Sequence, residues 1–267
     1  MMTTPLLSVR NLTVGFTHYT GTLGLRPRVV PAVEGLELDI DPGEILAVIG
    51  ASGSGKSLLA HAIVGILPNT ATVSGGIDYD GTPLDSARLR RLRGREISFI
   101  PQSVNYPDPL MPVGRQVRLT LPRSRAAQLQ QALFARYHLD EKVARQYPHE
   151  LSGGMLRRVL FATGVTETMR LLIADEPTPG LHPAALQEVL SHLRDLADDG
   201  AGVLLITHDL IAAAAIADRV AVMRSGRVVT VESSSSFTGR GETLRHEYAR
   251  RLWRALPRHD FWEGVAP

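Results

Sequence analysis

The chain contains no cysteine among its 267 residues. This absence excludes a disulfide framework, a zinc site with thiolate ligands, a cysteine-ligated iron–sulfur cluster and a thiol nucleophile. Long apolar runs are missing too, since the longest, around residues 211–217, is far shorter than the roughly 18 residues of a membrane-spanning helix. The first residues show no basic segment followed by an apolar stretch, so we expect no secretion signal and a cytoplasmic location.

Lysine is the next scarce residue. It occurs only at Lys56 and Lys142 among 29 basic residues, so a position that has lysine rather than arginine is informative about function. The formal net charge of +2 is small, and it does not require a nucleic-acid partner. Arginines gather at residues 88–95 and near the C-terminus, a pattern typical of solvated helical surfaces. The length and a hydrophobic share of 44% predict one α/β domain with a smaller appendage.

The order of apolar residues predicts an α/β fold with two kinds of sheet. Alternating apolar and polar residues, typical of antiparallel strands and hairpins, occur at residues 7–16, 36–40 and 77–81, and residues 220–231 predict two short strands around Ser225-Gly226. Continuous apolar runs, typical of strands buried on both faces of a parallel sheet, occur at residues 45–49, 171–174 and 203–207. Periodic apolar residues predict helices at residues 58–67 and 183–196. We therefore expect a mainly parallel core sheet after an N-terminal antiparallel β-subdomain.

The middle and the end of the chain differ in composition from the rest. Prolines at positions 107, 109, 112 and 122 precede a stretch of helical periodicity at residues 124–145, which predicts an inserted helical subdomain at about residues 103–165. Four serines at residues 233–236 are typical of a linker, and residues 242–256 predict an amphipathic helix. We expect one main domain at residues 1–232, followed by this linker and a C-terminal helical extension at residues 233–267.

A glycine-rich segment between a predicted strand and a predicted helix fits the P-loop pattern G-x-x-x-x-G-K-[ST]. Glycines let successive backbone N–H groups surround a polyphosphate, and the following helix directs the positive end of its dipole there. Lys56 would reach the terminal phosphates of ATP, and the Ser57 hydroxyl would bind Mg²⁺. An ordinary glycine-rich turn is the alternative. The predicted ATP-binding residues are Gly50, Ala51, Ser52, Gly53, Ser54, Gly55, Lys56, Ser57 and Leu58.

Two carboxylates, Asp175 and Glu176, follow the apolar run at residues 171–174. A parallel strand delivers its C-terminal end to the ligand crevice, so Asp175 is predicted to hold Mg²⁺ and Glu176 to face the water that attacks the γ-phosphate. Alone, such a pair is more often a helix cap or a solvated turn. Its position after a P-loop favours the catalytic interpretation.

The segment Leu151-Ser152-Gly153-Gly154-Met155, combined with these motifs, resembles the signature of ATP-binding cassette (ABC) ATPase subunits. The resemblance covers about residues 6–255 and keeps the order of the family's motifs. It implies the ABC ATPase fold of P-loop NTPases. It also implies that the last four signature residues, at the start of a helix, contact the ATP held by a partner subunit in a head-to-tail dimer.

The same resemblance implies roles for residues outside these motifs. Gln102 would touch Mg²⁺ or the attacking water, and His208 would contact the γ-phosphate, although a lone histidine after a strand is usually structural. Phe16 stands where the family stacks an aromatic ring on adenine; Tyr19 is its rival, and core packing is the other interpretation of Phe16. The implied catalytic set is Lys56, Gln102, Glu176 and His208, and the implied Mg²⁺ set is Ser57, Gln102 and Asp175.

Two departures from the family's usual pattern help to place the chain within it. Met155 stands where many relatives have glutamine, and the segment is similar to that of the nickel, peptide and opine-metallophore importer branch. The arginine-rich tail resembles the extension of the same branch, or is an amphipathic helix that covers the core; its lack of cysteine favours nickel or metallophore members. His182 replaces the usual aspartate of a loop that crosses the dimer interface, which implies unequal sites in a heterodimer or a tolerated substitution.

These observations predict the ATP-hydrolysing subunit of an ABC importer for nickel, a metal chelate or peptides. The resemblance implies ATP and Mg²⁺ as ligands and a peripheral position on the cytoplasmic face of the cell membrane. The implied partners are a second, different ABC ATPase subunit, transmembrane permease subunits and, indirectly, an extracytoplasmic solute-binding protein, with no specific nucleic acid. The alternatives are a soluble ABC ATPase acting on nucleic acid, the ATPase of an exporter or lipoprotein-release system, and a non-enzymatic regulatory cassette.

Overall fold

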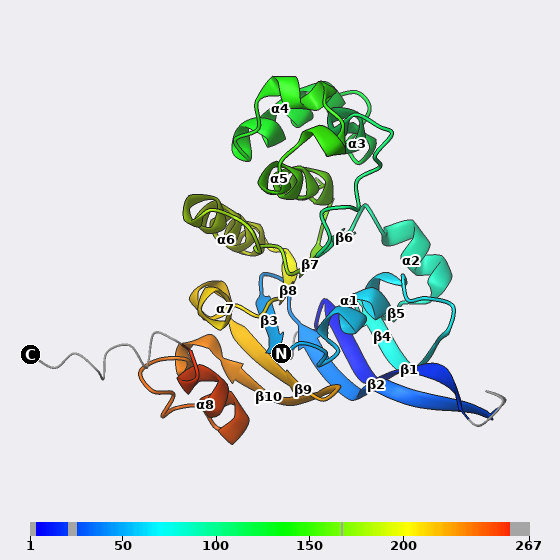
Figure 1. The fold of residues 1–267 in the computed structure, drawn as a ribbon, viewed down its shortest axis with the longest axis vertical. Helices are drawn as coiled ribbons and strands as arrows, with labels where there is room; N and C mark the ends of the chain where they lie inside the picture. Colours follow the sequence, from blue (N-terminus) through cyan, green and yellow to red (C-terminus); the bar gives the residue numbers. More distant parts are fainter. Residues whose placement is uncertain (1–3, 21–25, 167, 257–267) are drawn as a thin grey trace, which may run out of the picture.

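The computed structural model describes residues 4–20, 26–166 and 168–256, whose strands form two sheets (Figure 1). The smaller sheet is antiparallel, in the order β2-β1-β4-β5. Its strands are β1 (Leu7–Thr20), β2 (Arg26–Ile40), β4 (Ala71–Tyr79) and β5 (Thr82–Pro83). The predicted N-terminal antiparallel β-subdomain is confirmed.

The larger sheet is mainly parallel, in the order β10-β9-β3-β8-β7-β6, and its antiparallel pair is β9–β10. Its strands are β3 (Ile45–Gly50), β6 (Ile97–Ile100), β7 (Leu171–Asp175), β8 (Gly202–Ile206), β9 (Arg219–Arg224) and β10 (Arg227–Ser233). The predicted parallel core sheet is confirmed. Its order brings the C-terminal ends of β3, β6, β7 and β8 to one edge.

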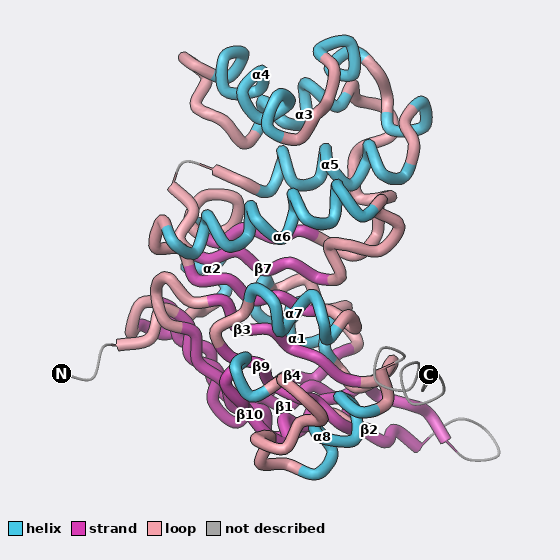
Figure 2. Tube along the Cα trace, turned by 90° about the vertical axis from the view of Figure 1, so that its left-hand side faces the viewer, coloured by secondary structure: helices cyan, strands magenta, loops and turns pink. Residues whose placement is uncertain are grey.

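Helices α3, α4 and α5 gather at one end of the molecule, beyond β6 and β7 (Figure 1), and Figure 2 shows α6 lying over β7. The α-helices are α1 (Lys56–Val64), α2 (Ser86–Leu92), α3 (Val113–Leu119), α4 (Ala126–Arg136), α5 (Gly153–Gly164), α6 (Pro183–Asp198), α7 (Leu210–Ile216) and α8 (Glu247–Arg254). Short 3-10 helices are η1 (Glu141–Arg145), η2 (Pro148–Glu150) and η3 (Ser234–Ser236). Among the described helices, none has the length and apolar character needed to span a membrane.

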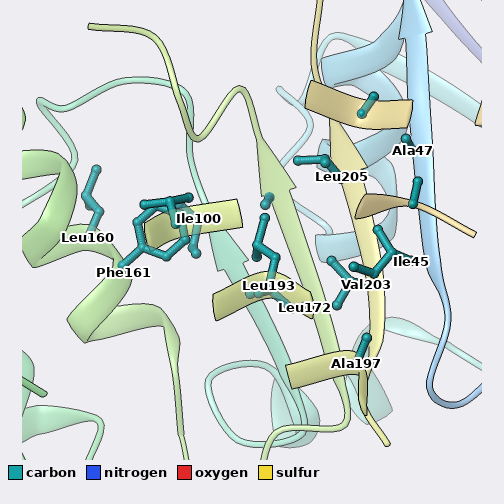
Figure 3. Packing of buried hydrophobic residues seen from close by; sticks show 14 of the residues in the cluster. Ile45, Ala47, Ile100, Leu160, Phe161, Leu172, Leu193, Ala197, Val203 and Leu205 are labelled. Atoms are coloured by element: carbon teal, nitrogen blue, oxygen red, sulfur yellow. The ribbon is translucent and has the colours of Figure 1, made fainter. Parts of the chain in front are cut away.

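Consecutive residues of the central strands face two different cores, which is why their sequences are continuously apolar. On β3, Ile45 and Ala47 join the core shared with α5 and α6, whereas Leu46 and Val48 join the core shared with α1 and the antiparallel sheet. Figure 3 shows the first core, in which Phe161 of α5 lies against Ile100 of β6. The large sheet is therefore anchored on both faces, so its loops start from fixed positions.

The predicted helix at residues 124–145 is wrong in its extent. Helix α4 ends at Arg136, and His138 then takes a left-handed backbone conformation with φ 48°. The Asp140 carboxylate accepts a hydrogen bond from the Lys142 amide at 2.9 Å and so caps the separate helix η1. Local side-chain capping therefore divides a segment whose apolar period looks continuous.

Two other predicted helices have different bounds. Helix α1 begins at Lys56 rather than at residue 58 and ends before Gly65, whose φ of 65° makes it a left-handed C-cap. The C-terminal helix covers Glu247–Arg254 rather than residues 242–256, because the amides of Arg245 and His246 donate to the buried carboxylate of Glu232. Helix α2 lies at the arginine run that the sequence assigned to a helical surface. The sequence prediction missed β6 and the first half of β2, and residues 257–267 of the predicted extension lie outside the described part.

Helix α8 is attached to the same core as α5 and α6 through Trp253, which is 8% exposed. The indole N–H of Trp253 donates to the Gly239 carbonyl at 3.0 Å, and its ring meets Phe237 edge-on at a centroid distance of 5.7 Å. The separate domain boundary at residue 232 stays a prediction, but the described part of the tail packs on the core.

We expect Trp253→Ala to lower the free energy of unfolding by about 3–5 kcal/mol, the usual cost of removing a buried aromatic side chain. The exposed Arg251, which pairs with Glu247 at 2.7 Å on the same helix, provides the control. Arg251→Ala should change the free energy of unfolding by less than about 1 kcal/mol. Urea unfolding followed by circular dichroism measures both variants, and an equal loss in the two would contradict the packing role of Trp253.

Candidate functional site

The connection from β3 to α1 is a tight loop whose glycines cannot be replaced without conflict. Gly55, the N-cap of α1, has φ 99°, and a Cβ at this position would lie 2.9 Å from a Val33 methyl group. A Cβ on Gly50 would overlap the carbonyl oxygen of Met223. Because β9 and β2 pack closely against the outside of the loop, there is no room for side chains at Gly50 and Gly55.

Lys56 is the first residue of α1 and is only 8% exposed. Its ammonium group donates to the carbonyl oxygens of Gly50 at 2.8 Å and Ala51 at 3.2 Å. Burial lowers the pKa of Lys56, while the carboxylates of Glu176 and Asp175 act in the opposite direction. The loop thus holds a buried amine that gains from an anionic ligand.

Asp175 is the last residue of β7 and is 1% exposed. Its Oδ1 accepts a hydrogen bond from the Ser57 hydroxyl of α1 at 3.2 Å, which joins the P-loop to the acidic pair. Burial raises the pKa of Asp175, and the Ser57 hydrogen bond counteracts that rise. A buried carboxylate and a hydroxyl oxygen together are suitable oxygen ligands for Mg²⁺.

Glu176 follows directly and has the left-handed φ of 47°. Its amide donates to the Ile206 carbonyl of β8 at 2.8 Å, and its Oε2 lies 2.8 Å from Nδ1 of His208. The Glu176 side chain is 8% exposed, whereas that of His208 is 69% exposed. The exposed histidine ring therefore forms a hydrogen bond with one oxygen of a largely buried carboxylate.

These segments enclose a cavity of about 360 Å³. Residues 52–58 of the P-loop and α1 line one part, and Gln102, Glu176 and His208 line the rest. The fold thus brings together most of the predicted ATP-binding residues and the predicted catalytic set. Asp175 stands behind this lining and contacts it through Ser57.

Three predicted elements do not line this cavity in the described part of the chain. The signature residues lie at the N-terminus of α5, where the Ser152 hydroxyl accepts from the Met155 amide at 3.3 Å. His182 is the exposed N-cap of α6, and its Nδ1 accepts from the Ala184 amide at 3.4 Å. Phe16 is half-buried on β1 and packs against a core, while the side chain of its rival Tyr19 lies outside the described part.

Sequence reasoning missed Arg157, a residue of α5 that is 7% exposed. Its guanidinium group donates to the carbonyl oxygens of Glu176 at 2.7 Å and Gln102 at 3.3 Å. Burial lowers the pKa of Arg157, and the charge of Glu176 raises it. The available signal in the sequence was that Arg157 lies between two apolar residues, Leu156 and Val159, which are buried. Apolar residues at such positions indicate a helix face that packs on the core, where an arginine is unusual.

Comparison with known proteins agrees with this geometry. A family model described as ABC transporter matches residues 33–179. The chain is 38% identical over 96% of its length to the peptidoglycan transport ATP-binding protein YejF of Agrobacterium fabrum, and 34% identical over 95% of its length to the oligopeptide transport ATP-binding protein OppD of Bacillus subtilis. It spans 48% of the first relative, about half, and 72% of the second.

The fold is also similar to that of a solved protein, the dimeric ATP-binding cassette MJ0796 bound to ADP and Pi. The TM-score is 0.74 at 25% sequence identity, and the similarity covers 85% of this chain and 98% of that one. The family resemblance that the motifs indicated is confirmed: the chain belongs to the ABC transporter family, among relatives named as ATP-binding proteins of peptidoglycan and oligopeptide transport.

Proposed function

We propose that this chain is the ATP-hydrolysing subunit of a peptide importer. The observation that carries the proposal is the cavity in which the P-loop and Lys56 face the Glu176–His208 pair. A buried amine and a helix N-terminus favour a polyphosphate on one side, and a carboxylate oriented by a histidine is suited to activating water on the other.

ATP binding is assigned to the P-loop. Its backbone N–H groups and the Lys56 ammonium would hold the β- and γ-phosphates. Ser57 and Asp175, whose Oγ and Oδ1 lie 3.2 Å apart, would hold Mg²⁺ with help from Gln102. Mg²⁺ would supply positive charge that neutralises the phosphate oxygens. The predicted adenine contact of Phe16 remains a prediction.

Hydrolysis is assigned to Glu176. The water oxygen forms a bond to the γ-phosphorus while the bond between that phosphorus and the β,γ-bridging oxygen breaks, and ADP and phosphate leave. Glu176 orients the water and accepts its proton. Because Oε2 of Glu176 already forms a hydrogen bond with His208, we assign Oε1 of Glu176 to the water. The exposed His208 ring would contact the γ-phosphate as well.

The cargo and partners are proposed from the relatives. Because the printed names of the relatives given above refer to peptidoglycan and oligopeptide transport, we favour peptides over nickel or a metal chelate. The partners would be a second ATPase subunit, transmembrane permease subunits and, indirectly, a solute-binding protein, with this chain peripheral on the cytoplasmic face. The signature at the N-terminus of α5 would then complete the site of the second subunit, as the dimeric state of the solved cassette supports.

The two lysines of the chain allow a matched test of ATP binding. Lys56→Ala removes a charge-assisted contact to phosphate, worth about 1.5–3 kcal/mol, so we expect the affinity for Mg-ATP to fall at least about tenfold. Lys142, whose side chain is 78% exposed and pairs with Asp140, is the control. Isothermal titration calorimetry should find Lys142→Ala unchanged, and unchanged affinity in Lys56→Ala would refute the P-loop assignment.

His182 bears on whether the two sites of the assembled pair are equal. Aspartate at this position would offer two acceptor oxygens and a negative charge to the partner's P-loop, whereas neutral histidine offers one acceptor, here already bonded to Ala184. We therefore propose a heterodimer in which the site facing His182 is the weaker one. His182→Asp should raise the ATPase rate of the reconstituted pair about two- to tenfold, the effect of one hydrogen bond.

The control for this substitution is His246, which caps α8 in the same way by accepting from the Tyr248 amide at 3.1 Å. His246→Asp should leave the rate unchanged, because α8 is not expected at the interface loop. An unchanged rate in His182→Asp, together with a stable and active homodimer, would reject the unequal sites.

A further inference from the structure

Arg157 is an unusual residue for its position, because it places a guanidinium group in the apolar interior between α5 and the large sheet. The flanking Leu156 and Val159 belong to the core shared by α5 and α6. A buried charge is costly unless its hydrogen bonds are satisfied, so its partners indicate what the residue is for.

The partners are two backbone carbonyls from different loops. Nη1 donates to the Glu176 carbonyl at 2.7 Å, and Nη2 donates to the Gln102 carbonyl at 3.3 Å. Both residues line the cavity. One planar group therefore sets the relative position of two loops that follow β6 and β7.

Glu176 needs such support. Its backbone φ of 47° lies in the left-handed region, which residues other than glycine, asparagine and aspartate rarely adopt. Its amide is held by Ile206 and its carboxylate by His208, and the bond from Arg157 holds its carbonyl. Without that third bond, the Glu176 carbonyl loses its Arg157 donor, and the bonds to Ile206 and His208 are left to hold the residue in this strained conformation.

We propose that Arg157 is the positioning residue for the hydrolytic step: it holds the backbone of Glu176, together with that of Gln102, in the geometry that directs the Glu176 carboxylate at the water. This role rests on the proposed ATPase function. Arg157 acts through Glu176: within the described part of the chain its guanidinium donates to the carbonyls of Glu176 and Gln102, neither of which belongs to the P-loop. A misplacement of about 1 Å at a reacting group reduces rates about 100-fold. Loss of Arg157 therefore lowers kcat and spares ATP binding.

Arg194 of α6 provides a matched control. It also cross-links distant segments through backbone carbonyls, with Nη1 donating to Ile216 at 3.2 Å and Nη2 to Gly43 at 3.1 Å. Neither of these carbonyls belongs to a residue that lines the cavity. Arg194 also pairs with Asp198 at 2.9 Å and Asp218 at 3.0 Å. Arg194→Met thus removes a bridging arginine without touching Glu176.

The experiment compares Arg157→Met, Arg157→Lys and Arg194→Met with the unchanged chain, each reconstituted with the partner subunit, at a temperature where all are folded. We expect Arg157→Met to lower kcat at least about tenfold while KM and the affinity for a non-hydrolysable ATP analogue stay within about threefold. Arg157→Lys, which keeps the charge but can satisfy fewer acceptors, should recover part of kcat. Arg194→Met should lower the melting temperature and keep kcat within about twofold.

Hydrogen exchange without nucleotide provides a readout that does not depend on activity. Exchange at residues 101–106 and 176–181 should rise in Arg157→Met and stay unchanged in Arg194→Met. A normal kcat in Arg157→Met overturns the proposal. So does a loss of kcat in Arg194→Met that, relative to the fall in its melting temperature, equals the loss in Arg157→Met. Failure of the unchanged reconstituted pair to bind or hydrolyse ATP refutes the proposed function instead, and unchanged exchange in Arg157→Met overturns the positioning role even then.

Discussion

The backbone of Glu176 is the constraint on which the site depends. A non-glycine residue in the left-handed region costs about 1–3 kcal/mol and persists only where its surroundings determine it. At φ 47°, Glu176 is held by β8 through its amide, by His208 through its carboxylate and by Arg157 through its carbonyl. The two apolar cores on either face of the large sheet supply the free energy that offsets this strain.

The parallel sheet explains why residues distant in sequence meet at one cavity. The strands β3, β6, β7 and β8 all end at the same edge, and each is followed by a residue that lines the cavity or stands directly behind it. The P-loop follows β3, Gln102 follows β6, Glu176 follows β7 and His208 follows β8. The antiparallel sheet and β9 then press on the P-loop from outside, so the phosphate side of the cavity is shaped by tertiary contacts as well as by its glycines.

A structural feature was predictable from the sequence when a short motif or a regular apolar pattern determines it. The P-loop and the acidic pair were predictable, because short motifs next to buried strands define them, and so was the parallel core, because its strands are continuously apolar. The end of α4 was not predictable from apolar period, because a local side-chain cap at Asp140, which that period does not register, starts a separate helix. The start of α8 was not predictable because it depends on the carboxylate of Glu232, 13 residues away from Arg245 in sequence. Arg157 was missed for the same reason: its partners are 19 and 55 residues away in sequence.

The central claim is that Glu176 activates water in a site that a second signature completes. Its most direct test is Glu176→Gln, which removes the base and keeps the P-loop contacts. We expect this variant to bind ATP without hydrolysing it, with a turnover at least about 100-fold below that of the unchanged chain, and to elute from size-exclusion chromatography as an ATP-dependent dimer with its partner subunit. Hydrolysis at the normal rate, or a variant that stays monomeric with ATP and its partner present, would contradict the account.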